Sequence, residues 1–405
     1  MKILQINSNL NVGSTGKIVE GIGLKVINEA GESYAAYGRN HNNSALSSYK
    51  IGNRWGLLYH FLLSRITDRQ GFYSSKATKK LIEKIETINP DIIHLHNLHG
   101  YYLNIEILFY YLSKANKPIV WTLHDCWAFT GHCCYFTRVD CTKWITGCNH
   151  CPLTKYYPQS YFIDNSYDNY INKKELFNKP KQMVFVTVSK WLYKEFNKSF
   201  LKSYSSEVIY NGVNLEIFKP KSQHELKNTY GFESKKIILG VANVWSDLKG
   251  LNDFLRLSKS LDNNTIIILI GLTQKQIKQL PSNIIGIQRT SDQHQLAEYY
   301  SMADVFICSS IAESFGLVIA ESIACGTPAI VYNTSAMPEL IQEGVGYVVE
   351  RGDINAVFDK IKIVFAKGKD SYANSCREFA LNNFDEKSSY EKYNQLYTSL
   401  LENKK

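Results

Sequence analysis

Two glutamates, Glu313 and Glu321, lie eight residues apart on either side of a short apolar run. The apolar residues 303–308 predict a buried strand, and residues 317–324 have the composition of a helix. Glu313 is then expected on the loop between them and Glu321 along the helix. Amides at a helix start lack intrahelical partners, and the helix dipole strengthens their attraction for an anion. The pattern predicts a phosphate site with a carboxylate on each side, which suits a nucleotide sugar.

Three histidines lie at the carboxyl ends of predicted strands. His124 comes after a buried strand at 118–123, at the end where parallel sheets bind ligands. Its imidazole could hydrogen-bond the sugar or the phosphate of a donor. His94 and His96 end the preceding strand and share one of its faces. They are candidates for contacting a second substrate, the acceptor of a transferred sugar. A hydrogen-bonded structural histidine is the alternative at each position.

Gly13 and Gly16 follow the first predicted strand, at 2–7, and open a helix. Small residues there let backbone amides approach a phosphate or a sugar closely. The segment is not a Walker loop, because Asn11 stands where its first glycine would be and Ile18 replaces the required Ser or Thr. A tight turn without a ligand is the alternative.

A cluster of cysteines lies in the segment 126–152, which holds six of the nine in the chain. Cys148 and Cys151 have the spacing of a metal knuckle, and Cys133 and Cys141 could complete a four-sulfur zinc site. Reduced thiols packed as small apolar groups are the alternative. A nucleic-acid-binding zinc ribbon would need a basic, aromatic strand face, which the segment lacks.

The 405 residues exceed what one hydrophobic core usually holds, so two domains are expected.

The positive charge is concentrated in the first half of the chain. Residues 1–200 contain 24 Lys and Arg against 14 Asp and Glu, whereas the remainder contains 22 Lys and Arg against 23 Asp and Glu. The whole net charge of +9 therefore falls in the first half, which favours an anionic partner there or serves solubility. No apolar signal region opens the chain, so a cytoplasmic location is expected.

The segment 55–66 is strongly apolar and has basic neighbours. These neighbours are Arg54, Arg65, Arg69, Lys76, Lys79, Lys80 and Lys84. This combination suits the inner face of an anionic membrane or a lipid-linked acceptor. A buried core helix with a solvated neighbour is the alternative.

Short apolar strands alternate with helical segments through both halves, and a second cycle begins near residue 236. The turn residues at 210–214 mark the boundary. This alternation predicts an α/β fold of two doubly wound parallel sheets with ligands at the carboxyl ends of their strands.

The run 310–331, with the sequence SIAESFGLVIAESIACGTPAIV, resembles the signature of retaining family-4 glycosyltransferases with the GT-B fold. The segments 337–347 and 208–220 extend the resemblance over nearly the whole chain. It implies two facing Rossmann-like domains: an acceptor-binding domain at 1–209 with the insert at 126–152, and a donor-binding domain at 210–385. The remaining residues, 386–405, would form a helix that packs back on the first domain.

The resemblance also assigns roles to site residues. Glu313 would contact hydroxyls of the transferred sugar, with His124 as the second catalytic group, and Glu321 would hold the ribose. The diphosphate and sugar would meet the loop of Gly13 and Gly16, the amides of Phe315, Gly316 and Leu317, and Lys249. Asn243 stands nearest to the position where the family has an arginine, so the family's second cationic phosphate contact is missing here.

The implied activity is transfer of a sugar from a nucleotide-sugar donor to a growing, lipid-linked surface glycan with retention at the anomeric carbon. Bacterial enzymes of colanic acid and exopolysaccharide assembly are the most similar members. No cofactor is expected for catalysis, beyond the structural zinc considered above, and no nucleic acid is expected as a partner. The alternatives are an epimerase or hydrolase of nucleotide sugars with the same fold, or a scaffold that binds glycolipid without catalysis.

Overall fold

The computed structural model describes residues 1–402. The chain divides into two compact units, one formed by Met1–Ile209 together with the chain from Tyr390 onward, the other by Tyr210–Ser389. Each unit is an α/β sandwich around a parallel sheet. The two units are described separately below.

The first unit has a seven-stranded sheet in the order β3-β2-β1-β4-β5-β6-β7, with every neighbouring pair parallel. The strands are β1 (Lys2–Asn7), β2 (Glu32–Tyr37), β3 (Ser47–Lys50), β4 (Ile92–Leu95), β5 (Ile119–Leu123), β6 (Met183–Thr187) and β7 (Ser206–Val208). The strand order reverses between β1 and β4. Doubly wound sheets bind their ligands outside the carboxyl ends of the strands at such a switch point.

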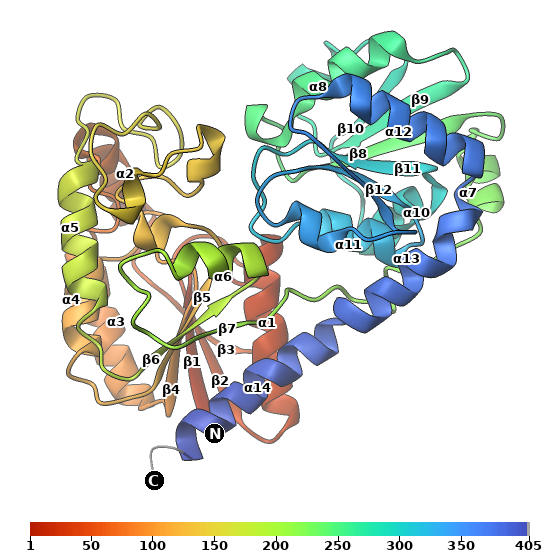
Figure 1. Cartoon of the computed structure of the whole chain (residues 1–405). Helices are drawn as coiled ribbons and strands as arrows, with labels where there is room; N and C mark the ends of the chain where they lie inside the picture. Colours follow the sequence, from red (N-terminus) through yellow and green to blue (C-terminus); the bar gives the residue numbers. More distant parts are fainter. Residues whose placement is uncertain (403–405) are drawn as a thin grey trace. The chain divides into compact units, whose positions relative to one another are not determined.

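Helices cover both faces of this sheet, with α1 and α14 on one side and α3, α4 and α5 on the other (Figure 1). The helices are α1 (Gly13–Asn28), α2 (Arg54–Thr67), α3 (Ser75–Ile88), α4 (Ile105–Leu112), α5 (Ser166–Phe177), α6 (Lys190–Phe196) and α14 (Glu386–Glu402). Helix α1 starts at Gly13, so Gly13 and Gly16 both belong to its first turn.

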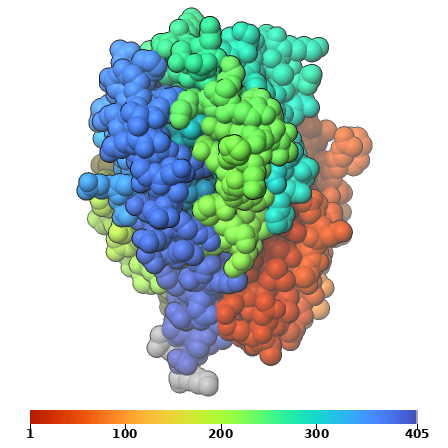
Figure 2. All heavy atoms as spheres, turned by 90° about the vertical axis from the view of Figure 1, so that its right-hand side faces the viewer, coloured from red at the N-terminus to blue at the C-terminus, as the bar shows by residue number. Residues whose placement is uncertain are grey.

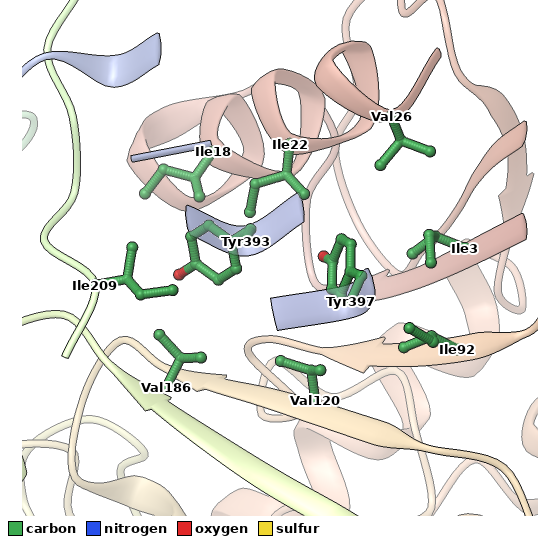
Figure 3. Packing of buried hydrophobic residues seen from close by; sticks show 10 residues of the cluster. All are labelled: Ile3, Ile18, Ile22, Val26, Ile92, Val120, Val186, Ile209, Tyr393 and Tyr397. Carbon is green, nitrogen blue, oxygen red and sulfur yellow. The ribbon is translucent and has the colours of Figure 1, made fainter. Parts of the chain in front are cut away.

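The C-terminal helix α14 packs into the core of the first unit. Its Tyr393 and Tyr397 contact an apolar cluster that α1 and the strands β1, β4, β5 and β6 supply (Figure 3). Gly21 of α1 lets the helices approach, because a Cβ there would lie 2.3 Å from the Tyr390 ring. In the space-filling view α14 runs along the surface beside N-terminal residues (Figure 2). The last helix is therefore an integral part of this unit.

The second unit has a six-stranded parallel sheet in the order β10-β9-β8-β11-β12-β13. The strands are β8 (Lys236–Val241), β9 (Thr265–Ile270), β10 (Ile284–Ile287), β11 (Val305–Cys308), β12 (Ala329–Tyr332) and β13 (Gly346–Val349). Central strands such as β9 are nearly continuous apolar runs, as expected for strands covered on both faces. Here the switch point lies between β8 and β11.

Helices α8 and α12 cover one face of the second sheet, and α10, α11 and α13 cover the other (Figure 1). The helices are α7 (Gln223–Tyr230), α8 (Leu251–Leu257), α9 (Gln274–Ile277), α10 (Gln293–Met302), α11 (Leu317–Ala324), α12 (Ile354–Lys367) and α13 (Asp370–Asn383). The two doubly wound parallel sheets confirm the predicted fold class. Within residues 1–402, no helix combines the length and the hydropathy that crossing a bilayer requires.

Candidate functional site

The loops that follow β8 and β11 contact each other at the switch point of the second unit. The amide of Ile311 donates to the carbonyl of Leu248 at 2.8 Å, and the Ser309 hydroxyl donates to the carbonyl of Gly250 at 3.2 Å. Gly250 has a φ of +74°, and a Cβ there would lie 2.3 Å from the Ser309 carbonyl oxygen. A glycine is therefore required to bring the loop carrying Lys249 against the loop carrying Glu313.

Lys249 and Glu313 form an ion pair across these loops. Nζ of Lys249 lies 2.5 Å from Oε1 of Glu313, although the residues are 64 positions apart in the sequence. Burial acts to lower the pKa of Lys249, but the charge and hydrogen bond of Glu313 outweigh it, and the pKa is raised above its ordinary value. The ammonium group is therefore charged at neutral pH and lies at the end of the sheet where an anion would bind.

Two serines hold the Glu313 side of the pair. The Ser310 hydroxyl donates to Oε1 of Glu313 at 2.8 Å, and the backbone amide of Glu313 donates to the Ser335 hydroxyl at 2.9 Å. The Glu313 side chain is 13% exposed. The carboxylate is fixed in one place but still open to a ligand.

Helix α11 begins directly after this loop. Gly316 has a φ of +104° and sends the chain into the helix without a side-chain cap. Within the described residues, no backbone hydrogen bond is recorded for the amides of Phe315, Gly316 and Leu317. The Phe315 ring is buried against Tyr210 and Phe384, which fixes the backbone that carries these amides. The arrangement is suited to binding an anion.

Glu321 lies about one turn into α11, on the part of the helix that is neither fully buried nor fully exposed. The buried Tyr300 donates its hydroxyl to Oε2 of Glu321 at 2.9 Å. Burial, the Glu321 charge and this hydrogen bond all raise the pKa of Tyr300, so the tyrosine stays a neutral donor. Glu321 is thus positioned as a carboxylate acceptor for ligand hydroxyls beside the anion site.

Asn243, at the position of the missing arginine, is exposed on the loop after β8. Trp245, two residues further along the loop, does not fill the space of the missing arginine. It is buried against Phe254 and donates its indole N–H to the carbonyl of Ile270 at 2.9 Å. Lys249 is therefore the one cationic side chain, among those the sequence suggested as phosphate contacts, that lies on the switch-point loops of this unit.

In the first unit, Gly13 and Gly16 lie in the loop and helix start that follow β1. Gly13 has a φ of +66° with open space where a Cβ would lie. Gly16 packs against the preceding loop, since a Cβ there would lie 3.1 Å from the Asn11 amide nitrogen. The helix has no side-chain cap and no acidic residue in its first turn. The loop therefore presents free helix-start amides without a competing negative charge.

A hydrogen-bonded chain of side chains orients His124. Gln5 donates its amide to the Val19 carbonyl, so its Oε1 accepts from Nε2 of His96 at 3.1 Å. Nδ1 of His96 must then accept from Nε2 of His124, at 3.1 Å. Burial lowers the pKa of His124 to about 4, so the ring is neutral and its Nδ1 keeps a lone pair. This nitrogen can accept a hydrogen bond from a hydroxyl group.

His94 is part of the core instead. Its side chain has no exposed surface; Nδ1 lies 2.6 Å from the hydroxyl of Tyr397 and Nε2 lies 2.8 Å from the hydroxyl of Thr122. Both ring nitrogens are engaged by protein, and the residue joins β4 to α14. His96 is also buried and acts on His124. Neither histidine has a ring nitrogen left to bond an acceptor, and His96 acts on the cavity through His124.

A histidine–aspartate pair, His99 and Asp125, lies beside His124 and was not recognised in the sequence. Nε2 of His99 lies 2.8 Å from Oδ2 of Asp125, and Nδ1 lies 3.0 Å from the hydroxyl of Tyr157. Burial would raise the pKa of Asp125, but His99 and the Trp127 amide outweigh it and lower the pKa. Asp125 could have been found in the sequence, because it is a carboxylate that directly follows His124 at the end of a predicted strand. No comparable sequence pattern marks Tyr300 or Ser335, which hold Glu321 and Glu313 in the second unit.

The loops after β4 and β5 leave a small cavity of about 10 Å³ between them. It is lined by residues 96–99 and 121–125, with Trp127 and Ala128. His124, His99 and Asp125 thus share one depression at the carboxyl ends of the strands. Cys133, Cys141, Cys148 and Cys151 lie elsewhere, around a separate cavity of the segment 126–152.

Two family models match consecutive parts of the chain. The model described as Glycosyltransferase Family 4 matches residues 59–217, and the model described as Glycosyl transferases group 1 matches residues 207–382. The second match contains Lys249, Glu313 and Glu321, and the first contains His124. The chain belongs to the glycosyltransferases of these groups.

Individual proteins agree with this assignment. The chain is 24% identical to a colanic acid biosynthesis glycosyl transferase of Escherichia coli, WcaC, over 87% of this chain and 88% of the relative. It is 28% identical to N-acetyl-alpha-D-glucosaminyl L-malate synthase of Bacillus anthracis, over 59% of this chain and 65% of the relative. The crystal structure of Anabaena HepE with UDP and glucose superimposes with a TM-score of 0.70 at 15% identity, covering 98% of this chain and all of that one. The last comparison establishes the shared GT-B fold.

Proposed function

We propose that this protein transfers a sugar from a nucleoside-diphosphate donor to a hydroxyl group of a growing surface glycan, with retention at the anomeric carbon. The observation that carries the proposal is the Lys249–Glu313 pair beside the uncapped start of α11. One cation, a row of amides and two carboxylates match a diphosphate that has a sugar on one side and a ribose on the other.

Each group of the second unit has a role in this proposal. Lys249 and the amides of Phe315, Gly316 and Leu317 bind the diphosphate and stabilise the charge that develops as it leaves. Glu313 accepts hydrogen bonds from hydroxyls of the transferred sugar. Glu321 accepts hydrogen bonds from the ribose hydroxyls, as its fixed position beside Tyr300 favours.

The reaction proceeds on one face of the donor sugar. The bond between the anomeric carbon and the phosphate oxygen breaks, and its electron pair leaves with the diphosphate. The acceptor hydroxyl oxygen bonds to the same face of the ion-pair-like sugar, and its proton passes to an oxygen of the leaving phosphate. No protein nucleophile is needed, and no metal or cofactor takes part in this scheme.

His124 serves as the polar contact of the first unit. Its lone pair at Nδ1, set by the Gln5–His96 chain, accepts a hydrogen bond from a sugar hydroxyl. His99 and Asp125 are positioning groups for the same depression, because Asp125 is already paired with His99 and the Trp127 amide. A neutral imidazole is the form this role requires, and burial provides it.

For the acceptor we propose a lipid-linked glycan met at the cytoplasmic surface of an anionic membrane. Helix α2 carries an apolar stripe at i, i+3, i+4, i+7 and i+11, formed by Trp55, Leu58, Tyr59, Leu62 and Ile66, and all five side chains are exposed. The residues this helix buries are His60 and Ser64. The expected alternative of a buried apolar helix is therefore wrong.

The apolar surface continues beyond α2. The amide of Tyr161 donates to the Arg65 carbonyl, and Tyr161, Phe162 and Ile163 are exposed next to it. Trp55 is 76% exposed and Phe162 80%. Exposed basic residues lie at the start of α2 and along α3, namely Arg54, Lys76, Lys79, Lys80 and Lys84. Aromatic side chains flanked by cations suit the interface of an anionic bilayer.

The transfer reaction is tested with a panel of nucleotide sugars and a lipid-pyrophosphate glycan extract. Sugar appearing in the lipid fraction, with equal release of nucleoside diphosphate, supports a transferase, and the anomeric proton coupling of the product reports retention. Free sugar or an epimerised nucleotide sugar formed without an acceptor would instead support the hydrolase or epimerase alternative. Binding of glycolipid with no turnover of any donor would support a non-catalytic scaffold.

The membrane surface is tested by co-sedimentation with vesicles containing phosphatidylglycerol. We expect binding that weakens at high salt and is lost in Trp55→Ser/Leu62→Ser. Leu381→Ser is a matched control, because Leu381 is an exposed leucine of the second unit. Equal binding to neutral vesicles, or no binding to any vesicle, would mean that the acceptor is met in solution.

A further inference from the structure

Four cysteines of the first unit's longest irregular segment line a single cavity. Cys133, Cys141, Cys148 and Cys151 surround a space of about 10 Å³, which is room for one water-sized sphere. All four are free thiols in this structure. The segment from 124 to 165 contains only short 3-10 turns between β5 and α5. Ordered irregular segments of that length are uncommon in compact domains and usually serve a function.

A buried histidine with an unsatisfied nitrogen lines the same cavity. The His132 side chain is fully buried, and its Nδ1 lies 2.5 Å from Oδ1 of Asp68. Its other nitrogen, Nε2, has no hydrogen-bond partner within the described residues. An unpaired buried polar atom costs free energy unless a ligand or a charged group satisfies it.

The backbone around the cavity is arranged to contact sulfur. The amide of Gly131 donates to Sγ of Cys148 at 3.2 Å. A Cβ on Gly131 would lie 2.0 Å from the Ser166 carbonyl oxygen and 2.7 Å from Cβ of Cys148, so only glycine fits there. Amide donors to sulfur stabilise the thiolate form that metals bind.

We propose that Cys133, Cys141, Cys148 and Cys151 bind one structural Zn²⁺, and that His132 donates Nε2–H to one of the thiolates. The knuckle pair Cys148 and Cys151 and the two further thiols provide the all-sulfur tetrahedral set that zinc prefers. Asp68 holds Nδ1 of His132, which fixes the ring at the edge of the cavity that the four cysteines line. All four sulfurs act as ligands, which leaves no open position for a catalytic water.

Binding must draw the cysteine loops together. Within residues 1–402, the one set of three ligand atoms found within 4.8 Å of one another is His99, Asp125 and Cys134, so the four sulfurs of the cavity are more widely spread. A tetrahedral site with Zn–S bonds of about 2.3 Å places its sulfurs about 3.8 Å apart. The metal therefore contracts the segment 126–152 and ties it to Asp68 at the end of α2.

The test is elemental analysis of the full-length protein, purified without chelator and without a metal-affinity step. We expect roughly one zinc per chain, since the cavity holds one ion. Cobalt replacement should give the visible absorption of a tetrahedral four-thiolate site, which counts the sulfur ligands. Hydrogen exchange of the segment 126–152 should increase when a thiol reagent or a strong chelator removes the metal.

Two variants and a matched control assign the ligands. Cys148→Ser and Cys151→Ser should each lose the zinc, whereas Cys126→Ser should retain it, because Cys126 is buried in the same segment but does not line the cavity. If the ligand variants fail to fold, the cobalt spectrum of the unaltered protein still decides the ligand set. Protein without zinc, protein with iron in its place, or a Cys148→Ser variant with full zinc content would overturn the proposal.

Discussion

Replacing Glu313 by glutamine should separate turnover from nucleotide binding. Glutamine has the same shape and can still accept from the Ser310 hydroxyl, but it removes the negative charge that lies 2.5 Å from Nζ of Lys249. Lys249 is 28% exposed, so water screens much of the lost ion pair, and we expect a loss of about 1 kcal/mol in the free energy of unfolding. The fold should therefore survive.

The effect on turnover should be much larger. If Glu313 contacts the transferred sugar in the transition state, its loss should lower kcat by about 10²-fold, which corresponds to about 2.7 kcal/mol. Nucleoside diphosphate should bind as tightly as before or more tightly, because the Lys249 charge no longer has an internal partner. The Kd is measured by calorimetry and kcat by transfer of labelled sugar.

Two variants complete this experiment. Glu343→Gln is the matched control, because Glu343 is an exposed glutamate of the same unit. Lys249→Met should weaken nucleoside diphosphate binding by roughly tenfold or more, as expected for a lost charge-assisted contact. Near-normal kcat in Glu313→Gln would refute the reasoning. A parallel loss of diphosphate binding and of folding would instead assign Glu313 a structural role.

Three further predictions concern stability and geometry. Tyr397→Phe should lower the free energy of unfolding by about 1–3 kcal/mol, because it leaves Nδ1 of His94 without a partner, and Tyr397→Ala should cost more through lost packing; urea titration measures both. The pKa of the buried His124 is lowered from 6.5 to about 4, so the folded form stays neutral while the unfolded chain takes up a proton. The contribution of His124 to stability should therefore be constant above pH 7 and be lost as the pH falls from 6.5 to 4, so His124→Asn should reduce the slope of stability against pH in that range. Gly250→Ala would force a Cβ against the Ser309 carbonyl and should weaken nucleoside diphosphate binding with little change in helix content, as calorimetry and circular dichroism can check.

The sequence predicted the fold because its signals are local. Apolar runs such as 265–270, followed by helical segments, indicate a parallel sheet without any tertiary information. The position of Glu313 on a strand-to-helix loop follows from the same pattern. Helix α1 begins at Gly13, since positive φ and small side chains allow the helix to start within the glycine loop.

The pairings of the site could not be predicted, because they join residues that are distant in the sequence. Lys249 meets Glu313 across 64 positions, and His94 meets Tyr397 across 303. The same limitation explains why His94 was expected on the acceptor side. Periodicity also does not reveal which side of a helix faces solvent, so the stripe from Trp55 to Ile66 was compatible with either burial or exposure.

The most direct test of the account is the affinity of the protein for nucleoside diphosphates, measured by calorimetry with UDP, GDP and ADP. The account predicts that at least one of them binds, and that Glu321→Gln weakens this binding by roughly tenfold or more while Glu343→Gln does not, since only Glu321 would hold the ribose hydroxyls. Glutamine at position 321 still accepts from Tyr300, so the packing of α11 is kept. Absence of binding to all three nucleotides, or equal binding by the Glu321→Gln variant, would contradict the claim that the second unit is the donor site.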